Sequence, residues 1–229
     1  MKQSTLICLL GHVLGQGPGD NHRGVSKVYD NRDNVQAMLK KLLKQRMDNH
    51  SLTAEDMLSS GCWCQLLTSN FLASNRGEPV NALDAACRKW HKCNQCTMID
   101  DSACLGYQHN YGIASYDSQN KQYVCSNEAE NTCKHNACTC DVALASELAD
   151  LSDEYEEQYG PTFDVTQCPA GMGGNASNNK QTDQCCGSYP DRFPFSSESG
   201  QRNCCNGKVS APFSRKATAC VLRFLPVPF

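Results

Sequence analysis

This sequence has no long hydrophobic run after its first residues, no block of basic residues and no internal repeat. A membrane-spanning helix needs about 18–20 consecutive apolar residues, and no segment beyond the N-terminus approaches that length. With a formal net charge of −3 and a pI of about 6.1, the chain also lacks the concentrated positive face that nucleic-acid binding requires. We therefore expect no transmembrane segment and no nucleic-acid partner.

Cysteine, in contrast, is abundant, with seventeen residues. Cytosolic thiols are kept reduced, so this density indicates an oxidising compartment and a framework of disulfides. Two sequons, at Asn49 and Asn175, are consistent with glycosylation during secretion, although two such triplets also arise by chance in a chain of this length. We expect a secreted, extracellular protein.

The first residues have the pattern of a secretory signal peptide at 1–17. A positive start at Lys2 is followed by an apolar stretch over 4–14 and then by small residues. Cleavage there would remove Cys8 and leave sixteen cysteines, and full pairing requires an even number. His12 interrupts the apolar stretch, so an apolar start to the mature chain is the alternative.

Composition divides the rest of the chain into four segments. They are a polar, flexible lead-in at 18–33, a main domain at 34–159, a linker rich in Gly, Asn, Pro and Ser at 160–180, and a cysteine-rich tail module at 181–229.

The main domain carries apolar stripes at helical spacing. They predict a helix over 34–47 and two longer helices over 80–99 and 137–155. Both longer stripes are narrow and include cysteines, which suits two helices joined by disulfides. Between them, 113–116 and 121–125 flank a turn and predict a small β-hairpin. The expected fold is mainly α, with this hairpin and an irregular, cysteine-rich C-terminal module.

Several motifs follow one another along residues 50–150. They are Gly61-Cys62-Trp63-Cys64, then Gly77-Glu78-Pro79-Val80-Asn81-Ala82-Leu83-Asp84, then Cys87 and Cys93, and finally Cys133 and Cys138-Thr139-Cys140-Asp141. This order resembles the secreted phospholipase A2 family. The resemblance implies that 34–159 is a phospholipase A2-like domain, built on a disulfide-linked pair of antiparallel helices. A zinc site is the alternative use of the closely spaced cysteines, but structural zinc prefers wider spacings in paired knuckles.

The resemblance also implies a disulfide pairing. Carried over position by position, it gives Cys64–Cys87, Cys93–Cys140, Cys104–Cys133 and Cys125–Cys138. A further bridge that is usual in the family would join the positions of Ala86 and Glu147, and here both of its cysteines are missing together. Cys62, Cys96, Cys168 and the tail cysteines remain unassigned, with Cys62–Cys168 as one option.

Catalysis in this family, as the resemblance implies it, needs three side chains. A histidine on the first long helix acts as general base, an adjacent aspartate holds Ca²⁺ together with loop carbonyls, and a second aspartate orients the histidine. Counting between the flanking cysteines places Trp90 at the base position and His91 at the calcium carboxylate position, while Asp141 matches the orienting aspartate. An indole nitrogen can only donate, and a neutral imidazole is a poor ligand for Ca²⁺.

We therefore expect a vestigial site at Trp90, His91 and Asp141, with no catalytic residue, no cofactor and no metal; Ca²⁺ would bind only if this interpretation is wrong. Residues 65–76 agree, because they contain no glycine to aim carbonyls at a metal. A one-residue slip would put His91 at the base position, but it would turn the imidazole by roughly 100° about the helix axis. Lys92 would then replace the calcium aspartate, so both registers predict an inactive protein.

The tail module has cysteine pairs at 185–186 and 204–205, followed by Cys220. This pattern resembles the double-cysteine repeat of galaxin-like proteins. Joined to a degenerate phospholipase A2-like core, it resembles the insoluble shell-matrix proteins of molluscs and related invertebrates. A segment of this length cannot bury a core of its own, so cross-links must hold it.

Three functions remain open. The first is a non-catalytic extracellular structural or matrix component, including a role in biomineralisation, whose partners are other matrix proteins or further copies of itself. The second is a secreted lipid- or protein-binding protein that uses the vestigial slot and the apolar residues Leu66, Leu67, Phe71 and Leu72. The third is an active Ca²⁺-dependent phospholipase A2.

Overall fold

The computed structural model describes residues 38–44, 47, 52–67, 77–104, 111, 113–117, 119, 122–126, 132–169 and 182–210. The predicted signal peptide at 1–17, the lead-in at 18–33 and both sequons, Asn49 and Asn175, lie outside the described residues.

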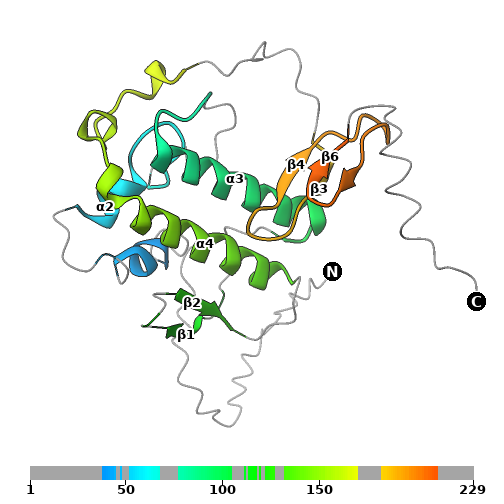
Figure 1. Ribbon diagram of the computed structural model, residues 1–229, viewed down its shortest axis with the longest axis horizontal. Helices are drawn as coiled ribbons and strands as arrows, with labels where there is room; N and C mark the ends of the chain where they lie inside the picture. The colour runs from blue at the N-terminus through cyan, green and yellow to red at the C-terminus, as the bar shows by residue number, and fades with distance from the viewer. Residues whose placement is uncertain are drawn as a thin grey trace, which may run out of the picture.

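Two long helices, α3 at Ala82–Asp100 and α4 at Cys133–Asp150, form the centre of the protein (Figure 1). Residues 38–44 are also helical. The remaining elements are short: α2 at Ala54–Leu58, the hairpin of β1 at Ile113–Asp117 and β2 at Gln122–Cys125, three 3₁₀ turns at Ser152–Glu154, Glu157–Tyr159 and Val165–Gln167, and four tail strands, β3 at Gln184–Cys186, β4 at Phe193–Phe195, β5 at Cys204–Cys205 and β6 at Lys208–Val209. The fold is mainly helical with the small hairpin β1–β2, as the sequence predicts, and the tail, which was expected to be irregular, forms two further short antiparallel hairpins.

Side-chain caps decide where the two long helices begin. The Asn81 side chain accepts a hydrogen bond from the backbone N–H of Asp84 at 3.0 Å, and Thr132 accepts one from the N–H of His135 at 3.3 Å. The second helix was expected over 137–155, but it spans Cys133–Asp150, so that both its start and its end lie about one turn earlier, and a 3₁₀ turn at Ser152–Glu154 follows it. Its first residues carry no apolar stripe, so hydrophobic periodicity alone misplaces its start, whereas the threonine cap gives it correctly.

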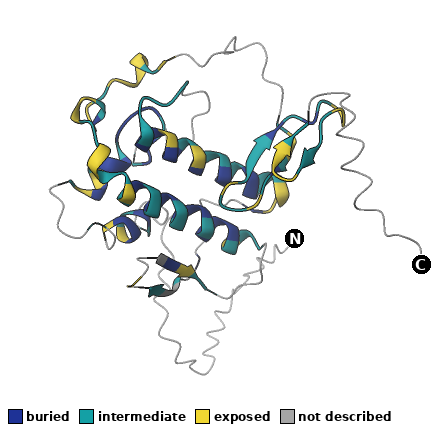
Figure 2. Ribbon diagram, viewed as in Figure 1, coloured by how far each residue is buried: buried dark blue, intermediate teal, exposed yellow. Residues whose placement is uncertain are grey.

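The helices α3 and α4 lie side by side, and most of the core lies between them and the elements that cover them (Figure 2). The buried side chains at this interface include Leu83, Cys87, Trp90, Leu144 and Leu148. Leu66, which the sequence suggested as part of a binding surface, is only 1 % exposed and belongs to the same core.

Disulfides fasten the helices to one another and to the loops. The four bridges that the resemblance implies are present as Cys64–Cys87, Cys93–Cys140, Cys104–Cys133 and Cys125–Cys138. The structure also contains Cys62–Cys168, Cys96–Cys185 and Cys186–Cys204. The two antiparallel helices are therefore cross-linked directly, by Cys93–Cys140, as well as through their flanking segments.

The first half of the segment expected as a linker, 160–180, is tied to the core instead. Cys168 is bonded to Cys62, and the N–H of Glu78 donates to the carbonyl of Pro169 at 3.0 Å. Residues 160–169 are thus an extension of the helical domain. Their polar, Gly- and Pro-containing composition hid this, because the attachment uses a disulfide and backbone hydrogen bonds rather than apolar side chains.

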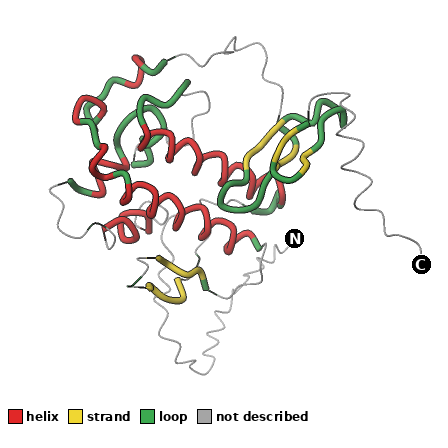
Figure 3. The backbone as a smooth tube through the Cα atoms, in the orientation of Figure 1, coloured by secondary structure: helices red, strands yellow, loops and turns green. Residues whose placement is uncertain are grey.

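The tail does not form a separate lobe. Its first hairpin, β3–β4, packs against the C-terminal half of α3, where Figure 3 shows the strands crossing beside the helix. The Cys96–Cys185 bridge makes this attachment covalent, and Gln95 donates from Nε2 to the hydroxyl of Thr182 at 3.0 Å. The tail module is held by cross-links and polar contacts, as its short length requires.

Candidate functional site

Trp90 lies in the middle of α3 and faces α4. Its side chain is 2 % exposed, and its Nε1–H donates a hydrogen bond to Oδ1 of Asp141 at 2.6 Å. The bridges at Cys87 and Cys93 hold α3 on both sides of this residue and thereby set its rotation about the helix axis. The position that faces the aspartate of α4 is therefore occupied by an indole, which cannot accept a proton.

Asp141 lies in the protein interior and accepts hydrogen bonds from neighbouring side chains. It is 1 % exposed and also accepts a hydrogen bond from the hydroxyl of Tyr111. Burial disfavours the charged carboxylate and raises its pKa to about 6, although the hydrogen bonds from Tyr111, Trp90 and Asn94 act in the opposite direction. Burial and the neighbouring Asp141 likewise raise the pKa of Tyr111. The aspartate accepts from fixed donors and has no base to orient.

His91 points away from Asp141. Its Nε2 lies 3.1 Å from the carbonyl oxygen of Trp63, and because a carbonyl only accepts, this nitrogen carries the proton and donates. The imidazole is enclosed edge-on by two indoles, with ring centroids 5.7 Å from Trp63 and 4.9 Å from Trp90. The slipped register, with His91 at the base position and Lys92 beside it, is not the one that the structure adopts.

The residues at the calcium position do not fit Ca²⁺. A hard cation needs oxygen ligands, and the family type of site would combine a carboxylate with loop carbonyls. Here an imidazole N–H occupies the carboxylate position and is directed at a loop carbonyl, that of Trp63. A donor hydrogen aimed at that oxygen competes with any cation for it. We therefore derive no catalytic step through calcium.

Asp84 was missed as a site residue, although it organises the loop beside the helix. It is fully buried, and its carboxylate accepts hydrogen bonds from the backbone N–H groups of Trp63, Cys64 and Val80. Gly61 makes this approach possible: its φ is +60°, and a Cβ there would lie 2.5 Å from Oδ1 of Asp84. The motif that ends in Leu83-Asp84 contains this residue, and a carboxylate three positions after the helix N-cap Asn81 was the signal that could have identified it.

The space around Trp90 is almost filled. A cavity of about 10 Å³ lies beside it, lined among others by Ala86 and Glu147, the two positions where the family's additional bridge is missing. A volume of this size accommodates about one water molecule. Pro190 of the tail also lines this cavity, and Lys89 of α3 forms ion pairs with both Glu147 of α4, at 3.3 Å, and Asp191 of the tail, at 2.9 Å.

Comparison with known proteins agrees with this architecture. The family model described as Phospholipase A2 matches residues 36–160, more than half of the 229-residue chain. The basic phospholipase A2 homolog AppP2 of Agkistrodon piscivorus piscivorus is 30% identical over 125 residues, which cover 55% of this chain and 88% of the relative. The basic phospholipase A2 homolog APL-K49 of Agkistrodon piscivorus leucostoma is also 30% identical over 125 residues, covering 55% and 78%. Phospholipase A2 homolog 1 of Bothrops atrox is 31% identical over 121 residues, covering 53% and 75%.

Proposed function

This chain belongs to the phospholipase A2 family, and we propose that within it the protein is a secreted, non-catalytic member that serves as an extracellular structural or matrix component. The observation that carries the loss of catalysis is the 2.6 Å hydrogen bond from the indole of Trp90 to Asp141. Hydrolysis in the family needs a group that removes a proton from water, and an indole N–H cannot do so.

The matrix role is supported by the way in which the tail is built. Bridges tie the helices, the loops and the tail into one covalent network, including Cys62–Cys168 and Cys96–Cys185. Such a network resists unfolding in an extracellular environment, because the cross-links lower the entropy of the unfolded chain. Other matrix proteins, or further copies of this chain, are the partners that we propose. No helix in the described part of the chain is long and apolar enough to cross a bilayer.

The vestigial slot gives little support to the lipid-binding alternative. Trp90 is 2 % exposed, and the cavity beside it holds about 10 Å³, far below the roughly 300–1,000 Å³ of ordinary small-molecule sites. An acyl chain cannot enter without displacing the indole. Leu66 is buried in the core and cannot contribute to a binding surface.

A micelle assay tests the absence of catalysis. The protein and its Trp90→His variant are incubated with phosphatidylcholine–detergent micelles, with and without Ca²⁺, and released fatty acid is titrated beside an active phospholipase A2. We expect no Ca²⁺-dependent release from either protein, because even a histidine at position 90 would have His91 in place of the calcium carboxylate. Calcium-dependent turnover by the unmodified protein would overturn the proposal.

Calorimetry tests the metal argument separately. Titration of the protein with CaCl₂ should give no binding at millimolar or higher affinity. If the protein did bind Ca²⁺, and if His91→Asp strengthened that binding, the loop carbonyls would still be accessible to a cation.

The matrix role needs a test of location. An antibody against the tail should detect the protein in the insoluble extracellular fraction of the tissue, and recovery only from soluble fluid would contradict the proposal. Peptide mass spectrometry of the same material tests cleavage after residue 17 and glycans at Asn49 and Asn175. An unprocessed, unglycosylated chain would argue against secretion itself.

A further inference from the structure

A groove of about 610 Å³ lies between the tail and the two long helices, away from the vestigial site. It is lined by Asp100 at the end of α3, by His135, Asn136 and Thr139 in the first turns of α4, and by the tail turn at 187–192. Its volume falls within the range of ordinary small-molecule sites. The groove exists only where the tail is docked, so it is a feature that the helical domain alone does not have.

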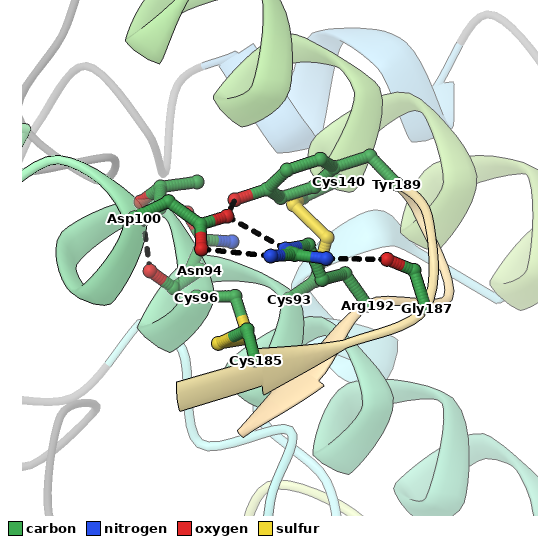
Figure 4. A network of polar contacts seen from close by, with 10 residues as sticks. Cys93, Asn94, Cys96, Asp100, Cys140, Cys185, Gly187, Tyr189 and Arg192 are labelled. Atoms are coloured by element: carbon green, nitrogen blue, oxygen red, sulfur yellow. Dashed lines mark hydrogen bonds and ion pairs between the residues drawn. A yellow bond between two sulfur atoms is a disulfide. The ribbon is translucent and has the colours of Figure 1, made fainter. Parts of the chain in front are cut away.

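The wall made by the tail is fixed by a polar network, shown in Figure 4. Arg192 donates from Nε and Nη2 to the two carboxylate oxygens of Asp100, at 2.6 and 2.9 Å, and from Nη1 to the carbonyl of Gly187. The hydroxyl of Tyr189 donates to the same carboxylate at 2.9 Å. The Cys96–Cys185 bridge lies beside this network and fastens β3 to α3. A wall of this kind loses little conformational entropy when a ligand binds.

The charges of the lining cancel each other. The guanidinium of Arg192 and the carboxylate of Asp100 form a bidentate pair, and no further Asp, Glu, Lys or Arg is among the described residues that line the groove. An ionic ligand would therefore find no uncompensated counter-charge in these walls. Its charge would have to compete with an existing pair, whose charge-assisted hydrogen bonds are the strong kind. A neutral ligand faces no such cost.

Hydrogen-bonding capacity nevertheless remains. Nδ1 of His135 is buried and has no hydrogen-bond partner among the described residues, although buried polar atoms are nearly always paired. Among the described residues, three of the five N–H groups of Arg192 donate in the contacts above. Asn136 and Ser188 bring an amide and a hydroxyl to the lining, so that donors and acceptors are mixed.

We propose that this groove binds a neutral carbohydrate chain. Sugar hydroxyls both donate and accept hydrogen bonds, which matches a lining with both functions and no net charge. Tyr189 also lines the groove and is half-buried, and the guanidinium of Arg192 lies over its ring, 5.8 Å from the ring centroid. The chemical class is thus set by the lack of uncompensated charge and by the unpaired Nδ1 of His135. The proposal stands on the groove alone and does not require the matrix role.

Isothermal titration calorimetry of the full chain tests it. The probes are neutral tetrasaccharides of glucose, mannose and N-acetylglucosamine, with a sulfated heparin tetrasaccharide as the ionic comparison. We expect at least one neutral probe to bind, and His135→Phe and Ser188→Trp, which remove the unpaired nitrogen and fill the groove, to weaken that binding about tenfold or more. Lys208→Ala, an exposed change on β6, is the control and should bind as the unmodified protein does. Near-ultraviolet circular dichroism checks that each variant keeps its fold.

Three results would overturn the proposal. They are no binding of any neutral probe, binding of the sulfated probe alone, and binding of a neutral probe that neither groove variant weakens although both are folded. The first two reject the ligand class, and the third places the sugar elsewhere on the protein. None of them depends on where the protein is found in tissue, so this test and that of the matrix role can fail separately.

Discussion

Replacing Trp90 tests whether its indole stabilises the protein through the hydrogen bond to Asp141 or only by filling space in the core. Trp90→Phe removes the N–H that donates to Asp141 but keeps an aromatic ring in the core. Trp63→Phe is the matched control, since these are the two tryptophans of the chain and Trp63 donates its N–H to the carbonyl of Gly77 at 3.2 Å. One indole donates to a carboxylate that titrates and the other to a carbonyl that does not. Both rings contact His91, so effects through that imidazole are common to the two variants.

The loss of stability expected for Trp90→Phe depends on the protonation state of Asp141, whose pKa burial raises to about 6. Above that pH the carboxylate is charged, and a lost hydrogen bond to a charged group costs about 1.5–3 kcal/mol; below it the group is neutral and the cost is about 0.5–1.5 kcal/mol. Trp90→Phe should therefore lower the free energy of unfolding by about 1–1.5 kcal/mol more at neutral pH than at acidic pH. This difference equals a rise of about one unit in the pKa of Asp141 in the folded state.

Guanidinium denaturation of the disulfide-intact protein measures this difference. Each variant keeps one tryptophan, whose fluorescence reports unfolding, and the titrations are run at about pH 4.5 and about pH 7.5, on either side of the folded-state pKa. Trp63→Phe should lose the same amount at both pH values. If the losses for Trp90→Phe were also independent of pH, the indole would not be supporting a charged carboxylate, and the role assigned to the bond between Trp90 and Asp141 would be wrong.

Three further changes test other parts of the structure. Burial raises the pKa of Asp141 from 3.8 to about 6 in the folded state, so the stabilisation by its protonated form is complete below the unfolded-state pKa and is lost as the pH rises through about 6. The loss of stability amounts to about 3 kcal/mol. Asp141→Asn should remove this pH-dependent loss in a pH series of denaturation curves. Ala86→Cys combined with Glu147→Cys should form a new bridge across the small cavity that both residues line, with no more free thiol than in the unmodified protein and a raised midpoint of denaturation that reduction reverses. Cys96→Ala combined with Cys185→Ala should destabilise the protein by about 2–4 kcal/mol and speed hydrogen exchange in β3 and β4, whereas unchanged exchange would show that polar contacts alone hold the tail.

The helical core was predictable because its cysteine spacings are tightly constrained. The resemblance to the phospholipase A2 family supplies the partners of Cys87 and Cys93, and these two bridges determine which side of α3 faces α4, so the resemblance implies the placement of Trp90 opposite Asp141. A bridge tolerates only a narrow range of Cα separations, which makes such an inference strict. The partner of His91, the carbonyl of Trp63, was not predictable, because loop carbonyls leave no pattern in a sequence.

The docking of the tail was beyond sequence reasoning for a different reason. Cys96 and Cys185 are 89 positions apart, and many pairings of the remaining cysteines were compatible with the sequence. The contact beside this bridge is the ion pair between Arg192 and Asp100, and a polar contact of this kind produces no apolar stripe from which it could be predicted. The groove depends on this docking and therefore leaves no signal of its own in the sequence.

The persistence of Asp141 in a site without a base has a structural explanation. Its carboxylate receives the N–H of Trp90 and the hydroxyl of Tyr111, both inside the protein. An apolar residue in its place would leave these donors unpaired, at a cost of about 1–3 kcal/mol each. The ionised carboxylate itself costs about 3 kcal/mol at neutral pH, from its pKa of about 6, so retaining it and losing two partners are of comparable cost. An indole at position 90 therefore needs a hydrogen-bond acceptor on α4, just as a catalytic histidine at the same position would. The presence of this aspartate is for that reason no indication of hydrolysis, and only the residue that faces it decides the question.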